Sequence, residues 1–179
     1  MKLLEAFKNN FCLTWKALML GREGVHNDFL PVTKKDIEEY AYSILGNKCG
    51  EEEYDLIFKL LSQIEIFDLC TPCIDQCLQS LSEIENTEWS TERRKWRYVS
   101  LDMLIRKLSG DVMSDIIDIY EFWTHYERPI ATLDIINESP LFDHVFYDKL
   151  LSSHREWLHQ EKAEIIEAEK NTEEKGTGK

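Results

Sequence analysis

The sequence contains few of the residues that break helices. Only 7 glycines and 4 prolines occur among its 179 residues. A β-sandwich needs many tight turns and uses more of both residues, so this composition favours helices. Hydrophobic residues make up 43% of the chain, which excludes wholesale disorder and is enough for a core.

The sequence also lacks a long apolar run. No stretch approaches the roughly 20 apolar residues that cross a bilayer as a helix. The first residues carry Lys2, Glu5 and Lys8, whereas the apolar part of a secretory signal carries no charge. The five cysteines are an odd number, which does not suggest a set of disulfides. We therefore expect a cytoplasmic protein with free thiols and no membrane contact.

Motifs that identify common reactions are missing. The sequence has no His-Glu-x-x-His pair, no Gly-x-Ser-x-Gly, no phosphate-binding glycine loop and no dinucleotide fingerprint. Its carboxylates are too numerous to single out a catalytic pair. We therefore predict no catalytic residues, no cofactor and a protein that is not an enzyme.

Positive charge is scarce, with 21 Lys and Arg against 34 Asp and Glu, a net charge of −13. Such a field repels nucleic acid and anionic lipid and attracts basic proteins, although it also serves solubility alone. The run Arg93-Arg94-Lys95-Trp96-Arg97 resembles a phosphate-contacting patch. In an acidic protein, one isolated cluster is more typical of a solvated face or of intramolecular ion pairs.

The central prediction is an αα-hairpin over residues 90–126. Apolar residues recur three and four apart on both sides of a turn at Ser109, Gly110 and Asp111, as they do along one face of a helix. Gly110 can adopt the left-handed conformation that ends a helix, and Asp111 can cap the next one. The inward stripes are Tyr98, Leu101, Leu104, Ile105 and Leu108, then Val112, Ile116, Ile119, Tyr120 and Trp123.

Further helical patterns lie on both sides of this hairpin. An amphipathic segment at residues 3–20 is expected to end at Gly21 and Gly24, and Thr33 is expected to cap the next helix. Acidic residues open a helix near residue 51, Thr71-Pro72 opens another, and Ser139-Pro140 precedes a long one. The fold class is therefore all-α, a single compact domain of six to eight helices over residues 1–168. Residues 169–179 are expected to form a disordered tail.

Three cysteines, Cys70, Cys73 and Cys77, fall within eight residues. Thiols at such short spacing can bind zinc or an iron–sulfur cluster, with Cys49 or a histidine as a further ligand. Spacings of three and four also describe one buried helical face, and cysteine is often buried as a small apolar residue. The pattern favours core residues, with no metal, and leaves a metal or redox role as the alternative.

Acidic residues step by four, three and three along the second helix of the hairpin. They predict either an ordinary exposed face or a docking rim for a basic partner, which would speed encounter and make binding salt-sensitive. Aromatic residues at the end of the same helix could act as anchors. The candidate partner-binding residues are Asp111, Asp115, Asp118, Glu121, Trp123 and Tyr126.

Short motifs in three regions also point to a known family. They are Leu13-Thr14-Trp15-Lys16, the stretch Lys35-Asp36-Ile37-Glu38-Glu39-Tyr40-Ala41, and Lys95-Trp96 with Tyr98, Leu101 and Asp118-Ile119-Tyr120. Together they resemble a family of small bacterial proteins, domain-of-unknown-function family 2247, over most of the chain up to about Tyr126. The resemblance implies a stand-alone bacterial cytosolic protein, and it carries no catalytic residues to transfer.

The leading functional hypothesis is a non-enzymatic binding protein. By analogy with other small acidic bacterial proteins, it would be an immunity or antitoxin-type protein that occludes a basic toxin domain with an acidic helical surface. The alternative is a small metal- or redox-active protein that uses Cys70, Cys73 and Cys77. A third possibility is a nucleic-acid binder that uses Arg94 and Arg97.

Overall fold

A computed structural model describes residues 3–24, 32–46, 50–66, 71–126 and 143–176. Within these residues it contains eight α-helices and no strands, which confirms the predicted all-α fold. The helices are α1 (Leu3–Lys8), α2 (Trp15–Glu23), α3 (Lys34–Leu45), α4 (Glu51–Ile66), α5 (Thr71–Ile84), α6 (Trp89–Lys107), α7 (Val112–His125) and α8 (His144–Gly176). The predicted start at Ser139-Pro140 lies outside the described residues.

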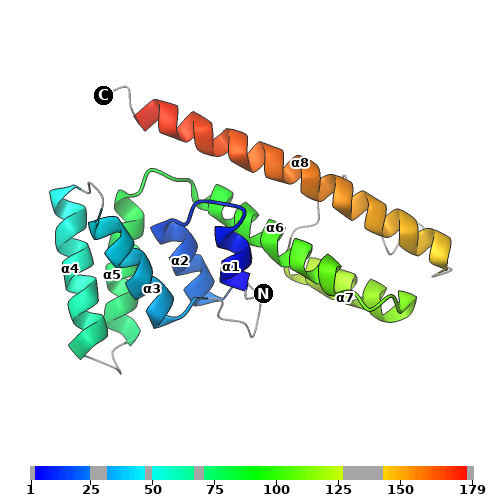
Figure 1. The fold of residues 1–179 in the computed structure, drawn as a ribbon, viewed down its shortest axis with the longest axis horizontal. Coiled ribbons are helices and arrows are strands. Elements are labelled where there is room, and N and C mark those ends of the chain that lie inside the picture. The colour runs from blue at the N-terminus through cyan, green and yellow to red at the C-terminus, as the bar shows by residue number, and fades with distance from the viewer. Residues whose placement is uncertain (1–2, 25–31, 47–49, 67–70, 127–142, 177–179) are drawn as a thin grey trace.

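The helices form an elongated body with α8 along one side (Figure 1). Helices α1 to α5 gather at one end, and the hairpin of α6 and α7 extends towards the other end. Contacts run continuously from α3 to α4, α5, α2, α6 and finally α8. Helix α6 therefore links the amino-terminal helices to the rest of the molecule.

The amino-terminal apolar segment divides into two helices rather than one. Thr14 caps α2 by accepting a hydrogen bond from the Ala17 N–H at 3.0 Å. Gly21 was expected to end this segment, but it lies inside α2, which ends at Glu23 with Gly24 as its cap. A Cβ at Gly21 would come within 2.5 Å of Val32 and 2.7 Å of the Trp96 ring. Gly21 thus allows α2 to pack closely against Val32 and Trp96, and it does not end the helix.

A turn between α5 and α6 holds the amino terminus of α2. The Glu85 carboxylate accepts hydrogen bonds from the backbone N–H groups of Trp15 and Lys16, both at 3.0 Å. The Lys16 ammonium donates to the carbonyl oxygens of Glu85 and Thr87 at 2.6 and 2.5 Å. Free N–H groups at a helix start favour a negative partner, so this carboxylate stabilises α2.

The predicted hairpin of α6 and α7 is confirmed. Gly110 has φ +87°, and the Asp111 carboxylate accepts a hydrogen bond from the Ser114 N–H at 2.9 Å. Ile116, Ile119 and Trp123 are buried as expected. The prediction for Tyr120 is wrong, because this side chain lies on the outer face of α7.

The basic run on α6 forms ion pairs with α8. Arg94 and Arg97 both contact Glu161 at 2.8 Å, and Arg94 also reaches Glu164 at 2.6 Å. Two hydrogen bonds from one Arg to a carboxylate make a strong, directional pair. Arg94 and Arg97 are therefore engaged within the molecule, as the ion-pair interpretation predicted, while Arg93 is exposed.

Helix α8 continues through most of the expected carboxy-terminal tail. The sequence predicts a disordered tail at residues 169–179, but α8 extends to Gly176. Glu169 contacts Lys95 at 2.7 Å, and Lys95 in turn contacts Glu92 at 2.7 Å, with both α6 side chains fully buried. Burial alone would lower the pKa of Lys95, but the two carboxylates outweigh it and hold this pKa above its ordinary value. This buried cation orders the beginning of the predicted tail.

Candidate functional site

Helix α7 carries most of the side chains that the sequence proposed for partner binding. Its buried face packs towards α6 and α8, so only the opposite face can meet a partner. The six candidate residues differ in how exposed their side chains are. Asp111, Asp118 and Glu121 are exposed, Tyr126 is half-buried, and Asp115 and Trp123 are buried.

Asp115 does not belong to an exposed acidic stripe, because its side chain is only 1% exposed. It accepts hydrogen bonds from the backbone N–H groups of Ser109 and Gly110 and from the Ser109 hydroxyl, each at 2.9 Å. The Tyr147 hydroxyl of α8 donates to Asp115 Oδ2, the oxygen that also accepts from the Gly110 N–H. Burial raises the pKa of Asp115, but these hydrogen bonds together outweigh it and hold the pKa below its usual value. The carboxylate therefore ties the hairpin turn to α8.

The two aromatic candidates also face the interior. Trp123 is 8% exposed, and its indole N–H donates to His154 Nε2 at 2.8 Å. The Tyr126 ring lies 4.7 Å from that of Phe122, and burial raises the pKa of Tyr126 to about 12. Neither side chain is placed as an exposed anchor.

The outer face of α7 instead presents an apolar row that the sequence analysis missed. Met113, Ile117 and Tyr120 are 52%, 48% and 44% exposed. Their spacing of four and three places them side by side on one helix. Asp118 and Glu121 each follow a member of this row by one residue, about 100° further round the helix, and both are exposed. We call these five residues the α7 face.

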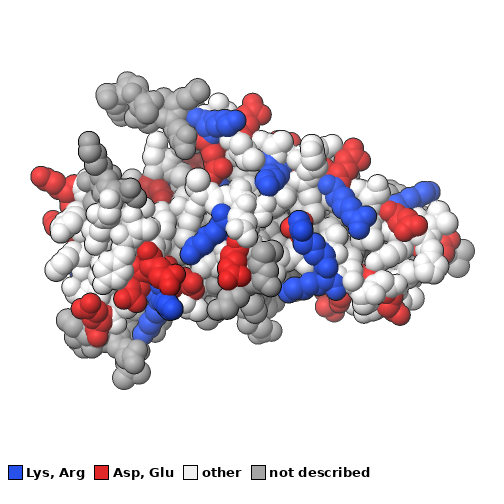
Figure 2. Space-filling model, in the orientation of Figure 1, with Lys and Arg blue, Asp and Glu red and all other residues white. Residues whose placement is uncertain are grey.

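Another exposed apolar pair lies on α4, at the other end of the molecule (Figure 1). Tyr54 and Phe58 are four residues apart and largely exposed, and Tyr42 on α3 is also exposed. In Figure 2 acidic side chains gather over α3, beside an uncharged surface over α4. Along α6 and α8 in the same view, acidic and basic side chains are interspersed. The α4 pair is therefore the natural comparison for the α7 face.

The thiols of α5 do not favour the alternative hypothesis. Cys77 is buried in the core and Cys73 is half-buried, while Cys70 lies outside the described residues. Burial raises the pKa of the Cys77 thiol, the opposite of what a nucleophilic thiol needs. Among the described residues no group of three or more His, Cys, Asp or Glu is arranged to hold a metal ion. A metal or redox role stays a prediction, which metal analysis of the purified protein would test.

Comparison with known proteins places the chain in a family. Residues 4–162 match the model of a family described as an uncharacterized protein conserved in bacteria, DUF2247. The chain belongs to the DUF2247 family. The match to DUF2247 runs from α1 into α8 and includes the whole of α7. Searches of curated proteins and of solved structures give no match.

The motifs that resemble DUF2247 meet inside the fold. The indole N–H of Trp96 donates to the Ala17 carbonyl at 2.9 Å, directly after the Leu13–Lys16 motif. Tyr40 of the α3 motif donates to the Leu13 carbonyl at 2.9 Å. These contacts show that the first two motifs and Trp96 define the packing of α2, α3 and α6, whereas the motif Asp118-Ile119-Tyr120 contributes Asp118 and Tyr120 to the α7 face. Among the described residues, we find no helix that combines the length and the hydrophobicity of a membrane span.

Proposed function

We propose that this DUF2247 protein is a non-enzymatic binding protein that occludes a basic partner domain, in the manner of a bacterial immunity protein. The observation that carries the proposal is the α7 face, where an exposed apolar row runs beside exposed carboxylates. Interfaces commonly combine an apolar centre with a polar rim, and a few central side chains supply most of the affinity.

The negative charge of the α7 face and of the whole chain favours a basic partner. Asp118 and Glu121 border the row, and the whole chain carries a net charge of −13. A basic surface would be attracted over long range and would then bury Met113, Ile117 and Tyr120. If the basic surface is itself a site for phosphate groups, the carboxylates replace the phosphates and block that site. The proposed mechanism needs no bond to be made or broken.

The first test is co-expression with the product of the neighbouring gene. We expect the two proteins to co-purify, the complex to weaken as salt is raised, and toxicity of the partner to be relieved. If the neighbouring product neither binds nor becomes less toxic, the proposed immunity function is wrong.

The second test locates the surface with two matched variants. Ile117→Lys on α7 is expected to weaken the complex by roughly 2 kcal/mol or more, about thirtyfold, because it removes an apolar contact and repels a basic partner. Phe58→Lys on α4 makes the same change on another exposed apolar residue and is expected to leave affinity unchanged. Loss of binding in the α4 variant alone would show that α7 is not the surface. Calorimetric titration and thermal melts of each variant separate binding from folding.

A further inference from the structure

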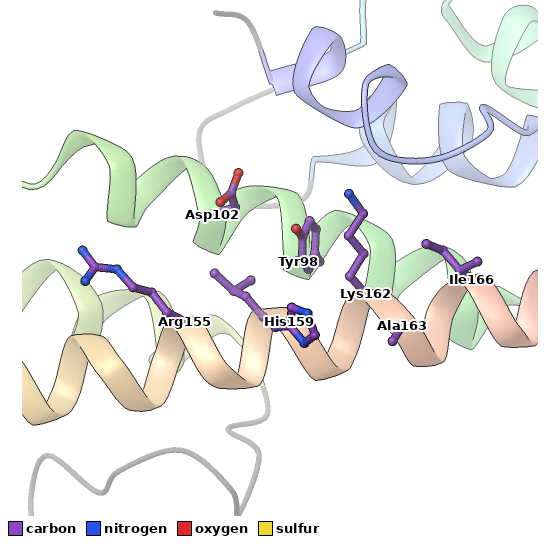
Figure 3. A pocket seen from close by; sticks show the side chains of 8 residues that line it. Tyr98, Asp102, Arg155, His159, Lys162, Ala163 and Ile166 are labelled. Carbon is purple, nitrogen blue, oxygen red and sulfur yellow. The ribbon is translucent and has the colours of Figure 1, made fainter.

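A groove lies between α6 and α8 (Figure 3), and none of its lining residues belongs to the α7 face. Its volume is about 390 Å³, within the roughly 300–1,000 Å³ of sites that hold small molecules. Tyr98 and Asp102 line it from α6, and Arg155, His159 and Lys162 line it from α8. Figure 3 shows Arg155 and Lys162 extending from α8 towards α6, with His159 between them along the helix.

The groove is positively charged in a strongly acidic protein. Arg155, His159 and Lys162 are spaced by four and three, so they share one side of α8. The acidic residue of the lining, Asp102, already accepts a hydrogen bond from Arg106 at 2.8 Å. The Arg155 guanidinium and the His159 ring have no hydrogen bond or ion pair within the described part of the chain. Their donors are therefore available to a ligand.

Lys162 is held in position for the same role. Its ammonium donates to the side-chain oxygen of Asn10 at 2.9 Å and lies 6.0 Å from the centre of the Tyr98 ring. An ammonium has three donors, so one bond to Asn10 leaves others for a ligand. The fixed position reduces the entropy that a ligand would have to overcome.

The rest of the lining is apolar. Leu158 is buried, Ile166 is half-buried, and both belong to the α8 wall of the groove. The Tyr98 ring, itself almost wholly buried, rises from α6 between the two helices. A bare inorganic anion would use the cations and leave this apolar surface uncovered.

We propose that the groove binds a small organic phosphate with an apolar or aromatic body. A phosphate monoester carries about −1.5 to −2 charges near neutral pH, which suits the row of Arg155, His159 and Lys162. Its body would lie against Tyr98 and the apolar wall. This proposal goes beyond the binding of a basic protein and rests on other residues. Either of the two proposals can therefore be wrong while the other is right.

Calorimetric titrations with three probes at low ionic strength test the contribution of the cations and that of the apolar wall to binding. Phenyl phosphate has both the anion and the ring, inorganic phosphate has the anion alone, and phenol has the ring alone. We expect phenyl phosphate to bind at least about tenfold more tightly than either of the others. Equal affinity for phenyl phosphate and inorganic phosphate would overturn the proposal for an organic ligand. Absence of phenyl phosphate binding up to about 10 mM would overturn the site itself.

Variants test whether the groove is where binding occurs. Replacing both Arg155 and His159 with Gln is expected to weaken phenyl phosphate binding by about tenfold or more, because two charge-assisted contacts are lost. Lys149→Gln removes an exposed cation from the same helix outside the groove and is expected to have no effect. Equal weakening by the control would show non-specific attraction to α8 and overturn the proposal. Thermal melts check that each variant is folded.

Discussion

Single residues join the hairpin of α6 and α7 to α8. The Asp115 carboxylate receives hydrogen bonds from the turn at Ser109 and Gly110 and from the Tyr147 hydroxyl. Burial raises the pKa of Tyr147, and its hydrogen bond to Asp115 adds to this effect, to about 12. The tyrosine thus stays protonated as a donor, and the aspartate stays ionised as an acceptor. Both ends of the contact are fixed over the physiological pH range.

This contact predicts a particular pH dependence of stability. The pKa of Asp115 is lower in the folded protein than in the unfolded chain, so its ionised form stabilises the fold above the unfolded pKa of about 3.9. That stabilisation is lost as the pH falls through the folded pKa. We expect Asp115→Asn to lower the free energy of unfolding by about 2 kcal/mol at neutral pH. Urea titrations should show a smaller decrease in its stability below about pH 4 than in the wild type.

Asp118→Asn is the matched control for this prediction, since Asp118 is exposed on the same helix. It should keep both the stability and the pH dependence of the wild type. If the two variants behave alike, the Asp115 carboxylate does not hold the turn.

The sequence predicts that α7 is a helix better than it predicts which of its side chains are buried and which are exposed. Aspartates at spacings of three and four are typical of a solvated face, and that expectation was right for Asp118. For Asp115 it was wrong, because its partners are the preceding turn and Tyr147, a residue 32 positions away. A signal for the exposed row was present in Met113, Ile117 and Tyr120, which share one side of α7 about 100° round the helix from Ile116 and Ile119. The predicted inward stripe includes Tyr120, and this prediction hides the exposed row.

At the scale of the helices, local sequence signals predict the helix caps correctly. They do not predict how the helices pack against one another. Thr33 forms the predicted cap of α3, with the Asp36 carboxylate completing a capping box. Asp111 likewise caps α7 as predicted. These devices depend on residues three apart and can be recognised in any sequence. The role of Gly21 depends on Trp96, far along the chain, so it could not be recognised locally.

Gly21→Ala tests the close approach of α2 to α6. Alanine normally stabilises an open helix position by about 1 kcal/mol relative to glycine. Here its Cβ would lie 2.5 Å from Val32 and 2.7 Å from the Trp96 ring, so we expect a loss of about 1–3 kcal/mol instead. The free energy of unfolding from urea titrations measures the difference.

Gly50→Ala provides the comparison, because nothing lies within 4 Å of the Cβ it would add. Its stability should stay within about 0.5 kcal/mol of the wild type. A Gly21 variant that is as stable as the Gly50 variant would contradict the packing described for α2.

At the scale of the whole molecule, α6 and α8 join the two ends into one folding unit. Helix α6 contacts α1 and α2 on one side and α7 and α8 on the other. Buried Lys95 lies between Glu92 on its own helix and Glu169 on α8. Separating α8 from α6 would break the pair of Lys95 with Glu169, and removing one partner of a buried ion pair costs several kcal/mol.

We therefore predict a single cooperative unfolding transition. Urea titrations followed by far-ultraviolet circular dichroism and by tryptophan fluorescence should have the same midpoint and slope. Trp15 packs against Tyr40 among α1 to α5, and Trp123 lies in α7 towards the other end, so fluorescence samples both. Two separated transitions would contradict the prediction of a single domain.

The attachment of α2 to the turn before α6 has a consequence for synthesis on the ribosome. The N–H of Trp15 meets its carboxylate partner 70 residues later in the chain. When the first helices leave the exit tunnel, the groups that hold them have not yet been translated. The cap of α2 by Glu85 and the packing of Phe7 against Trp96 cannot form until the stretch around these two residues emerges. Nascent chains stalled before and after that stretch should therefore differ sharply in their resistance to protease.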